Sequence, residues 1–374
     1  HNYLDFTNSG DYLNLSWKLM HDGAEIASGA VDGLDIAPHG EQTVSLPLEI
    51  PAEGTVTVDF FLTQKNDGGL TKAGQCLGTD QVILRRETRT GACGSHDAPA
   101  VEVKEEARRI IFTGADFRYV FNKETGVFDE MVYQNRTILQ KPMEYNIWRA
   151  PTDNDRNIRH QWEEAGYDRT LSRCYSAKVE MDGGKAVLKC AVSLSAIYIQ
   201  KLVEMDVCFT VCPAGGVKAD IQGKFGFGGL PHLPRFGLRL FLDKGMENVD
   251  YFGYGPYESY ADKHRASRLG RFAAKAEALH EDYLRPQENG SHWDCSEVTV
   301  AGKDLALTVR GDSFSFNASP YTQEELTAKR HNFELEKSGY TVLCLDGVMG
   351  GIGSNSCGPE LLEQYRVKDD SQLQ

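Results

Sequence analysis

The sequence lacks any apolar run long enough to cross a bilayer as a helix, and it has no segment patterned as a secretory signal peptide. Positive charge is also not in excess, because 40 Lys and Arg residues face 54 Asp and Glu residues, giving a net charge of −14. Nucleic acids and anionic membranes gain nothing from approaching such a surface. We therefore expect neither partner. Because the chain begins at His1 without a Met, we expect it to be an excised part of a longer polypeptide.

Paired cysteines are missing too. The nine cysteines are scattered, only Cys208 and Cys212 lie close together, and no Cys-x-x-Cys or Cys/His ligand spacing occurs. Cys93 and His96 stand near one another, but two ligands in a flexible segment make a poor metal site. The pattern predicts no metal site in this chain and mostly reduced core thiols, typical of a reducing compartment, which we expect to be the cytoplasm.

Helical periodicity is scarce and is convincing only around 161–165. Apolar residues alternate with polar ones at 13–19, 44–48 and 56–60 instead, and Gly-containing turns separate these runs. Short strands joined by turns, without helices, are typical of a β-sandwich. We therefore predict an immunoglobulin-like β-sandwich at residues 1–88.

Composition changes at 89–100, a Gly/Ala/Ser/Pro stretch that we predict to be an exposed linker. Strand patterns then resume and continue to the end of the chain, for example at 117–121, 238–242 and 305–309. Strands without helical crossovers indicate antiparallel sheets. The predicted fold class is all-β, with residues 101–374 forming a large antiparallel β-supersandwich.

The segment Trp148-Arg149-Ala150-Pro151-Thr152-Asp153-Asn154-Asp155 is the most informative part of the chain. Pro151 fixes its own φ and keeps Ala150 out of the helical region, so the run is predicted to be extended chain that enters a turn. The three short acceptor side chains of the turn can simply bond their own backbone. With Arg and Trp directly upstream, they also provide the flat apolar face and the hydrogen-bonding groups that suit a sugar.

Four further clusters in the second region could contribute chemistry. They are a Tyr-rich stretch at 251–262 with Glu258, the stretch 285–293 with Glu288 and Trp293, the stretch 316–331 ending in His331, and the Gly-rich stretch 346–359 with Asn355 and Cys357. Each has an ordinary structural explanation, such as a packed aromatic hairpin, a turn or a hydrogen-bonded histidine. The Gly-rich stretch has no helix or Lys-Ser/Thr pair after it, so we predict a tight surface loop rather than a phosphate loop.

Glycoside hydrolysis requires two carboxylates across the scissile bond. Candidate carboxylates are present, but no sequence spacing selects a pair among them: Asp153, Asp155, Glu258, Asp262 and Glu288. No Ser/His/Asp set is recognisable either. The residues alone therefore predict sugar contacts without a catalytic dyad.

Taken in order, the motifs of this chain resemble the C-terminal region of the long bacterial β-galactosidases of glycoside hydrolase family 2. The matching motifs span nearly the whole chain: Asp5-Phe6-Thr7-Asn8, then Arg-Ala-Pro-x-Asp-Asn-Asp, Gly-x-Gly-Pro-x-Glu-x-Tyr-x-Asp, Glu-Asn-Gly, Phe-Asn-x-Ser-x-Tyr and Asp-Gly-x-x-x-Gly-Ile-Gly. The resemblance implies an immunoglobulin-like domain followed by a galactose-mutarotase-like β-supersandwich.

The resemblance also implies what this chain would contribute to a larger enzyme. A sugar-binding jelly roll and a catalytic (β/α)₈ barrel would precede residue 1, and the barrel would hold both glutamates of the retaining mechanism and a Mg²⁺ ion. The loop formed by Arg149, Asp153, Asn154 and Asp155 would line the mouth of the pocket. The loop with Asn355 and Cys357 would approach the aglycone, where some relatives carry a stacking Trp that Cys357 cannot replace. The full-length enzyme would be a homo-oligomer.

Three functions follow as expectations. The first is a non-catalytic C-terminal part of a β-galactosidase that cleaves terminal β-D-galactosides such as lactose. The second is a free-standing aldose 1-epimerase, which would recruit a general base and acid from Glu258, Glu288, His292 and His331. The third is a carbohydrate-binding module with Trp148, Trp293 and the Tyr-rich stretch as its platform.

Overall fold

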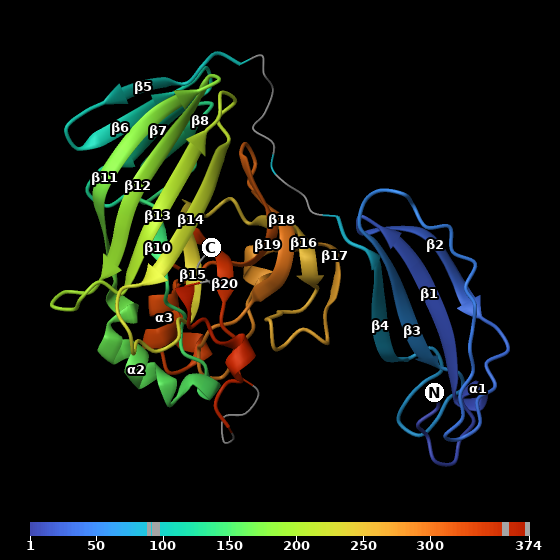
Figure 1. The fold of residues 1–374 in the computed structure, drawn as a ribbon. Helices are drawn as coiled ribbons and strands as arrows, with labels where there is room; N and C mark the ends of the chain where they lie inside the picture. The colour runs from blue at the N-terminus through green and yellow to red at the C-terminus, as the bar shows by residue number, and fades with distance from the viewer. Residues whose placement is uncertain (88–90, 92–97, 354–358, 371–374) are drawn as a thin grey trace. The chain divides into compact units, whose positions relative to one another are not determined.

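The computed structural model describes residues 1–87, 91, 98–353 and 359–370. The chain divides into two compact units, unit 1 with His1–Thr88 and Arg268–Arg271, and unit 2 with Arg89–Ser267 and Phe272–Gln374. Nearly all the regular structure of both units is antiparallel β-sheet (Figure 1). The all-β prediction is confirmed. Most of the predicted linker at 89–100, including Cys93 and His96, lies outside the described residues.

Unit 1 contains one four-stranded sheet, in the order β2-β1-β3-β4, with the short helix α1 before it. The elements are α1 (Ser9–Tyr12), β1 (Leu13–His21), β2 (Ala24–Val31), β3 (Val56–Gln64) and β4 (Cys76–Arg85). The alternation in β1 turns Trp17 and Leu19 inward, where they pack with Val56 and Val58 of β3. The predicted period of two is therefore confirmed for these two strands.

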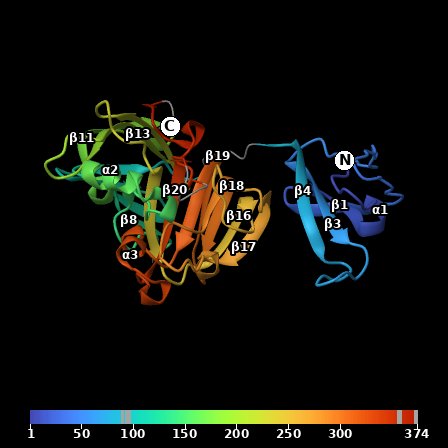
Figure 2. The ribbon, with the colours of Figure 1, turned by 90° about the horizontal axis from the view of Figure 1, so that it is seen from below.

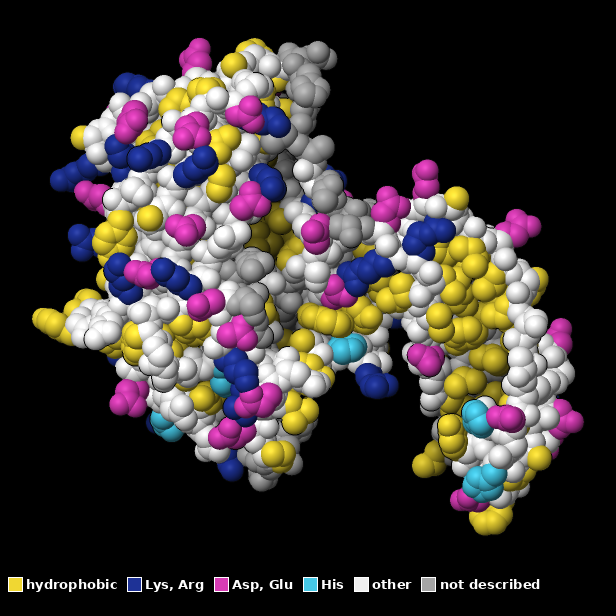
Figure 3. Space-filling model, in the orientation of Figure 1, with side chains coloured by type: hydrophobic (Ala, Val, Ile, Leu, Met, Phe, Trp, Pro, Cys, Tyr) yellow, Lys and Arg dark blue, Asp and Glu magenta, His cyan; other side chains and the backbone are white. Residues whose placement is uncertain are grey.

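The other layer of unit 1 is formed by the segment 32–55, which contains no strand. Leu46 and Leu48 pack against the core cluster, so the apolar alternation at 44–48 does describe a buried face. The strand predicted there is nevertheless wrong, because a strand also needs a neighbouring backbone to pair with, and a burial pattern does not report one. Hydrophobic side chains gather on the face of unit 1 seen in Figure 3, and Ile26 of β2 and Val82 of β4 are among its exposed residues.

Unit 2 is built from three antiparallel sheets. The five-stranded sheet contains β5 (Glu102–Glu105), β6 (Arg109–Thr113), β7 (Phe117–Asn122), β8 (Val127–Tyr133) and β9 (Arg136–Thr137). The four-stranded sheet contains β11 (Leu171–Asp182), β12 (Lys185–Ser195), β13 (Val203–Val211) and β14 (Val217–Phe225). The seven-stranded sheet has the order β10-β15-β20-β19-β18-β16-β17. Its strands are β10 (Glu144–Asn146), β15 (Arg235–Asp243), β16 (Asn248–Gly255), β17 (Arg268–Lys275), β18 (Ser291–Ala301), β19 (Ala306–Ser319) and β20 (Tyr340–Met349).

One continuous core joins the three sheets of unit 2. Phe128 of β8 meets Phe209 of β13 edge to face, with ring centroids 5.2 Å apart, so the five- and four-stranded sheets pack face to face. Tyr251 and Phe316 make a similar contact within the seven-stranded sheet, whose strands β16 to β19 lie side by side in Figure 2. A core of this extent positions the loops at the strand ends rigidly.

Helices are few and short. The predicted helical patch at 161–165 belongs to α2 (Ile158–Ala165), and α3 (Gln323–Ala328) begins where the Thr322 hydroxyl accepts a hydrogen bond from the Glu325 N–H, 3.2 Å away. Single 3₁₀ turns are η1 (Asp153–Asp155), η2 (Tyr167–Arg169), η3 (Ala276–Leu279), η4 (Asn332–Glu334) and η5 (Glu363–Tyr365). In the described part of the chain no helix combines the length and the apolar character needed to cross a bilayer.

The cysteines of the described residues are mostly thiols, as expected. Six are free: Cys76, Cys174, Cys190, Cys208, Cys295 and Cys344. Cys212 is disulfide-bonded, which the sequence did not predict. Cys208 and Cys212, the one pair that lies close in sequence, therefore differ in redox state.

Candidate functional site

A buried ion pair closes the loop at 149–155. Arg149 is fully buried, and its Nη2 and Nε donate to the two carboxylate oxygens of Asp155 at 2.7 and 3.1 Å. Asp155 Oδ2 also accepts from the main-chain N–H and the hydroxyl of Thr152, at 2.9 and 3.1 Å. A two-pronged contact between Arg and a carboxylate fixes both direction and distance. The Asp-Asn-Asp turn is therefore capped locally, and its Arg is part of the cap.

The same arginine ties the loop to the end of β20. Arg149 Nη1 and Nη2 donate to the carbonyls of Gly350 and Gly351, both at 2.9 Å. A Cβ at position 351 would lie 2.6 Å from Asp262 Oδ2, so only glycine lets the backbone come this close. The tight surface loop predicted at 346–359 is wrong for residues 346–353, because β20 continues to Met349 and Gly350, Gly351 and Ile352 are buried. The carbonyls of Gly350 and Gly351 accept from the Arg149 guanidinium, which glycine spacing alone does not reveal.

Asn154 and Asp262 hold the next two residues from opposite sides. The Asn154 amide donates to the carbonyls of Ile352 and Gly353, at 3.1 and 2.9 Å. The Asp262 carboxylate accepts the N–H groups of the same two residues, at 3.1 and 2.9 Å. Every main-chain polar group of Ile352 and Gly353 thus has a side-chain partner, which fixes the backbone of these two residues.

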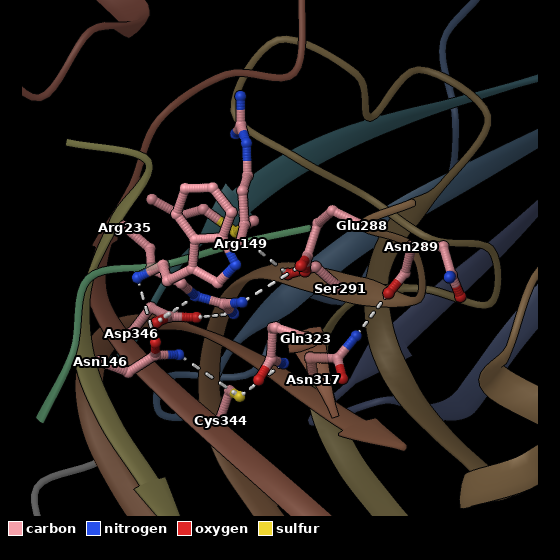
Figure 4. A network of polar contacts seen from close by, with 12 residues as sticks. Asn146, Arg149, Arg235, Glu288, Asn289, Ser291, Asn317, Gln323, Cys344 and Asp346 are labelled. Atoms are coloured by element: carbon pink, nitrogen blue, oxygen red, sulfur yellow. Dashed lines mark hydrogen bonds and ion pairs between the residues drawn. The ribbon is translucent and has the colours of Figure 1, made fainter. Parts of the chain in front are cut away.

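A second buried arginine lies behind the loop. Arg235 of β15 donates to both carboxylate oxygens of Asp346, at 2.9 and 2.6 Å, and to Glu288 Oε2 at 3.2 Å (Figure 4). The three side chains are 0 to 1% exposed. Burial by itself lowers the pKa of Arg235, but the carboxylates of Asp346 and Glu288 outweigh it and raise that pKa above its ordinary value. Arg235 is therefore a permanent buried cation.

Glu288 connects this centre to the loop. Its N–H donates to the Ala150 carbonyl at 2.9 Å, while its Oε1 has no hydrogen-bond partner among the described residues. Burial raises the pKa of the Glu288 carboxyl, and the nearby Arg235 only partly opposes this. Beside it, Gln287 Oε1 accepts the Asp153 N–H at 3.1 Å. The stretch 287–288 is thus the support on which the loop rests.

The outer side of the loop borders a cavity of about 330 Å³. Asn154 and Asp155 line it together with His232, Arg366 and Lys368. Burial lowers the pKa of His232 to about 4, with Arg149 and Arg366 adding to the effect, so this imidazole is neutral near pH 7. The wall is a mixture of amide, cation and neutral imidazole, which suits hydrogen bonding to a polar ligand.

The structure brings four of the predicted clusters together in one hydrogen-bonded network. They are the 149–155 loop, the 285–293 stretch through Glu288, the start of the 346–359 stretch, and the 251–262 stretch through Asp262. The 316–331 stretch reaches this network through Asn317, whose amide donates to the Asn289 carbonyl. Asp153 is exposed and Asn154 half-buried, whereas Arg149 and Asp155 face inward. The predicted Asn355 and Cys357 lie outside the described residues.

Other predicted residues have separate environments. Trp148 lines a different cavity from Asn154, and Trp293 stacks on His264 with centroids 4.5 Å apart beside a third cavity. The Glu258 carboxylate accepts hydrogen bonds from Lys263, Tyr283 and the Gly290 N–H, which makes it part of a packed turn. The Tyr-rich stretch is largely core, since its Tyr251 and Tyr260 are buried.

The acid and base of an epimerase are not assembled among the described residues. His331 is exposed and pairs with Glu334 at 3.2 Å, while Glu288 is buried against Arg235. His292 is buried between Tyr251 and Phe316, and burial lowers its pKa to about 4. None of Glu258, Glu288, His292 and His331 lines any of the three cavities described above.

Sequence reasoning missed two central residues, Arg235 and Asp262. Arg235 is the first residue of a mostly apolar strand, and a charge at such a position is a usable signal of a buried partner. Asp262 was predicted only as a sugar-bonding residue of the Tyr-rich stretch and as a candidate carboxylate, and its role as an acceptor for two backbone N–H groups had no signal in sequence. The described residues contain no group of three His, Cys, Asp or Glu side chains arranged to hold a metal ion.

Comparison with known proteins accounts for both units. Residues 113–374 match the family described as β-galactosidase small chain, and residues 1–85 match β-galactosidase domain 4. The β-galactosidase of Actinobacillus pleuropneumoniae is 38% identical over 99% of this chain and 36% of its own length. The β-galactosidase of Staphylococcus xylosus is 30% identical over 98% of this chain and 37% of its own. The chain therefore spans little more than a third of these relatives, and it belongs to the β-galactosidase small chain family.

Proposed function

We propose that this chain is the non-catalytic C-terminal part of a β-galactosidase that hydrolyses terminal β-D-galactosides with retention. The relatives are β-galactosidases almost three times as long, which leaves room for catalytic domains elsewhere in the polypeptide. The role that we assign to this chain is to complete the wall of the active site with the 149–155 loop.

The observation that carries the proposal is the way the loop is held. Arg149 and Asp155 are buried and fix the loop to β20, and Gln287 and Glu288 support it from below. Asp153 is left exposed, and the half-buried Asn154 lines the cavity, both on a backbone that these contacts hold. A preorganised rim of this kind positions a substrate without taking part in proton transfer.

In this proposal the catalytic carboxylates and the Mg²⁺ ion of the parent enzyme lie outside this chain, in a barrel domain. The parent enzyme would contain a jelly roll as well and would assemble as a homo-oligomer. The 374-residue chain alone is therefore expected to give no hydrolysis of o-nitrophenyl β-D-galactoside, whereas the longer polypeptide hydrolyses it. Turnover by the purified chain would contradict the non-catalytic role. Retention is tested by proton NMR of the first galactose formed, which should be the β-anomer.

The loop is tested in the longer polypeptide by Asp153→Ala and Asn154→Ala. Because misplacing a positioning group costs on the order of 10²-fold, we expect kcat/KM to fall by about that factor in at least one variant. The limbs of the pH–rate profile should not move, because the titrating catalytic groups lie elsewhere. Asp182→Ala is the matched control, since Asp182 is the exposed last residue of β11 and does not line the cavity beside the loop. Unchanged kinetics in both loop variants, with an intact fold, would make the loop a purely structural turn.

A further inference from the structure

A second and larger cavity, of about 700 Å³, lies in unit 2 away from the 149–155 rim. The β7–β8 hairpin, β10 and the residues from η2 into β11 enclose it, and all of its lining residues are among those the structure describes. This volume lies within the range of about 300–1,000 Å³ that small-molecule sites occupy. Nothing in the proposed function uses this cavity.

The charges of the lining exclude two classes of ligand. Five carboxylates and two arginines line the cavity. Both arginines are already paired, Arg239 with Glu144 and Glu324, and Arg169 with Asp168. The surplus of negative charge is unfavourable for phosphates and other anions. Among the described residues the carboxylates also form no group that could hold a metal ion. A neutral ligand fits this balance.

Asp129 provides acceptor capacity that the protein does not use. Its two carboxylate oxygens accept hydrogen bonds from one donor group, the amide of Asn122, at 3.3 and 3.1 Å. An ionised carboxylate can accept about four hydrogen bonds. Glu144 likewise is bonded to Arg239 through Oε2. Unused carboxylate lone pairs in a cavity are suited to hydroxyl donors.

Three largely buried aromatic residues also border the cavity. Tyr145, Trp148 and Tyr167 line the cavity and are 6, 5 and 0% exposed. The tyrosine hydroxyls are turned away, because they donate to the carbonyls of Gly126 and Pro231 at 2.8 and 2.7 Å. In the described part of the chain, the hydrogen bond made by Trp148 is that of its main-chain N–H with Asn146, so the indole N–H is a spare donor. Apolar rings with a spare donor, opposite carboxylate acceptors, match the mixed character of a sugar.

We propose that this cavity binds a neutral saccharide of one or two rings. Sugar hydroxyls donate to Asp129, and a sugar oxygen accepts from the Trp148 indole N–H. The site is separate from the 149–155 rim, so it stands whether or not the rim contributes to hydrolysis.

The test is fluorine NMR of the 374-residue chain labelled with 5-fluorotryptophan. The chain has four tryptophans, so four resonances are expected, and Trp148→Phe assigns the one at the cavity. Titration with galactose, glucose and lactose should move the Trp148 resonance saturably with a millimolar Kd. The Trp17 resonance of unit 1 is the internal control and should not move.

Two variants make the result specific. Asp129→Asn replaces one acceptor oxygen by a donor and should raise Kd by about tenfold, which corresponds to about 1.4 kcal/mol. Asp220→Asn is the matched control, because Asp220 lies on β14 in an exposed pair with Lys218 at 3.0 Å. Circular dichroism verifies that both variants fold. The proposal is overturned if no sugar shifts the Trp148 resonance or if Asp129→Asn leaves the sugar Kd unchanged. It is also overturned if spermidine or Mg²⁺ shifts the Trp148 resonance and the sugars do not.

Discussion

Arg235 and Arg239 lie four residues apart on one strand, β15, yet the two ends of that strand provide opposite environments. Arg235 is fully buried, and its partners Asp346 and Glu288 are 0 and 1% exposed. Arg239 is 12% exposed, while its partners Glu144 and Glu324 are 45 and 52% exposed. The first end supports the 149–155 rim, and the second borders the cavity at Trp148.

The difference shows that burial of the partners, rather than the number of contacts, decides what an ion pair contributes. Both arginines bond two carboxylates, but water screens the glutamates at the Arg239 end. At the Arg235 end neither charge can be solvated if its partner is removed. The same residue type therefore forms an essential centre at one end of β15 and a modest surface link at the other.

The largest effect is expected from Arg235→Met, which removes the cation and keeps much of the volume. Asp346 and Glu288 would then be buried without a counter-charge, and breaking a buried pair in this way costs about 3–5 kcal/mol. Urea unfolding followed by circular dichroism measures the loss. Adding Asp346→Asn to Arg235→Met should restore part of it, because one stranded charge disappears. A loss below about 1 kcal/mol for the single variant would show that water reaches this centre.

An intermediate effect that depends on pH is expected from Glu288→Gln. Burial raises the pKa of Glu288 in the folded chain, so folding favours its protonated form. Its contribution to stability is fully present below the ordinary pKa of a glutamate and is lost as the pH rises through the raised folded pKa. The Tm of the Gln variant should therefore improve relative to that of the wild type as pH increases across this window.

Comparing the Tm of the wild type with that of Glu288→Gln at each pH cancels the contributions of the other titrating groups. His232 and His292, whose pKa values burial lowers to about 4, destabilise both proteins equally as the pH falls from about 6.5 to 4. A Tm difference between wild type and Glu288→Gln that stays constant with pH would mean that the cations Arg235 and Arg149 cancel the combined effect of burial and of the carboxylates of Asp346 and Glu258 on the pKa of Glu288.

The smallest effect is expected from Arg239→Met. Because both glutamate partners are about half exposed, the loss should be about 1 kcal/mol or less, and 0.5 M NaCl should reduce it further by screening. The same unfolding measurement applies. A loss as large as that of Arg235→Met would abolish the distinction between the two ends of β15.

Much of the fold could be predicted from the sequence, because strand alternation follows from burial of one face. The patterns at 13–19, 56–60, 117–121 and 238–242 lie in strands, and the pattern at 305–309 begins one residue before β19. The region 171–225 was predicted to be β-sheet, but its four long strands, which form a whole sheet, were not individually delimited. The two edge strands of this sheet, β11 and β14, carry both apolar and charged residues at exposed positions. This weakens the alternation of apolar and polar residues by which a strand is recognised.

The candidate site was only partly predictable. The cluster around Arg149 to Asp155 could be identified because Pro and short acceptor side chains determine local backbone geometry. The direction in which each side chain points could not be predicted. In the structure Arg149 and Asp155 turn inward and Asp153 turns outward. Arg235 and Asp262 depend on partners about 110 and 90 residues away in sequence, as their bonds with Asp346 and Ile352 show.

The sequence by itself determined the all-β class, the presence of two β-rich regions and a rigid capped turn after Pro151, because these depend on local backbone preferences and on one-sided burial. Only the tertiary structure decided that this turn, the stretch around Glu288 and the end of β20 meet around two buried arginines. It also decided that Trp148 and Asn154, six residues apart, face different cavities. The physical reason is that ion pairs and cavities form between segments distant in the chain, and packing of the whole core determines which segments meet.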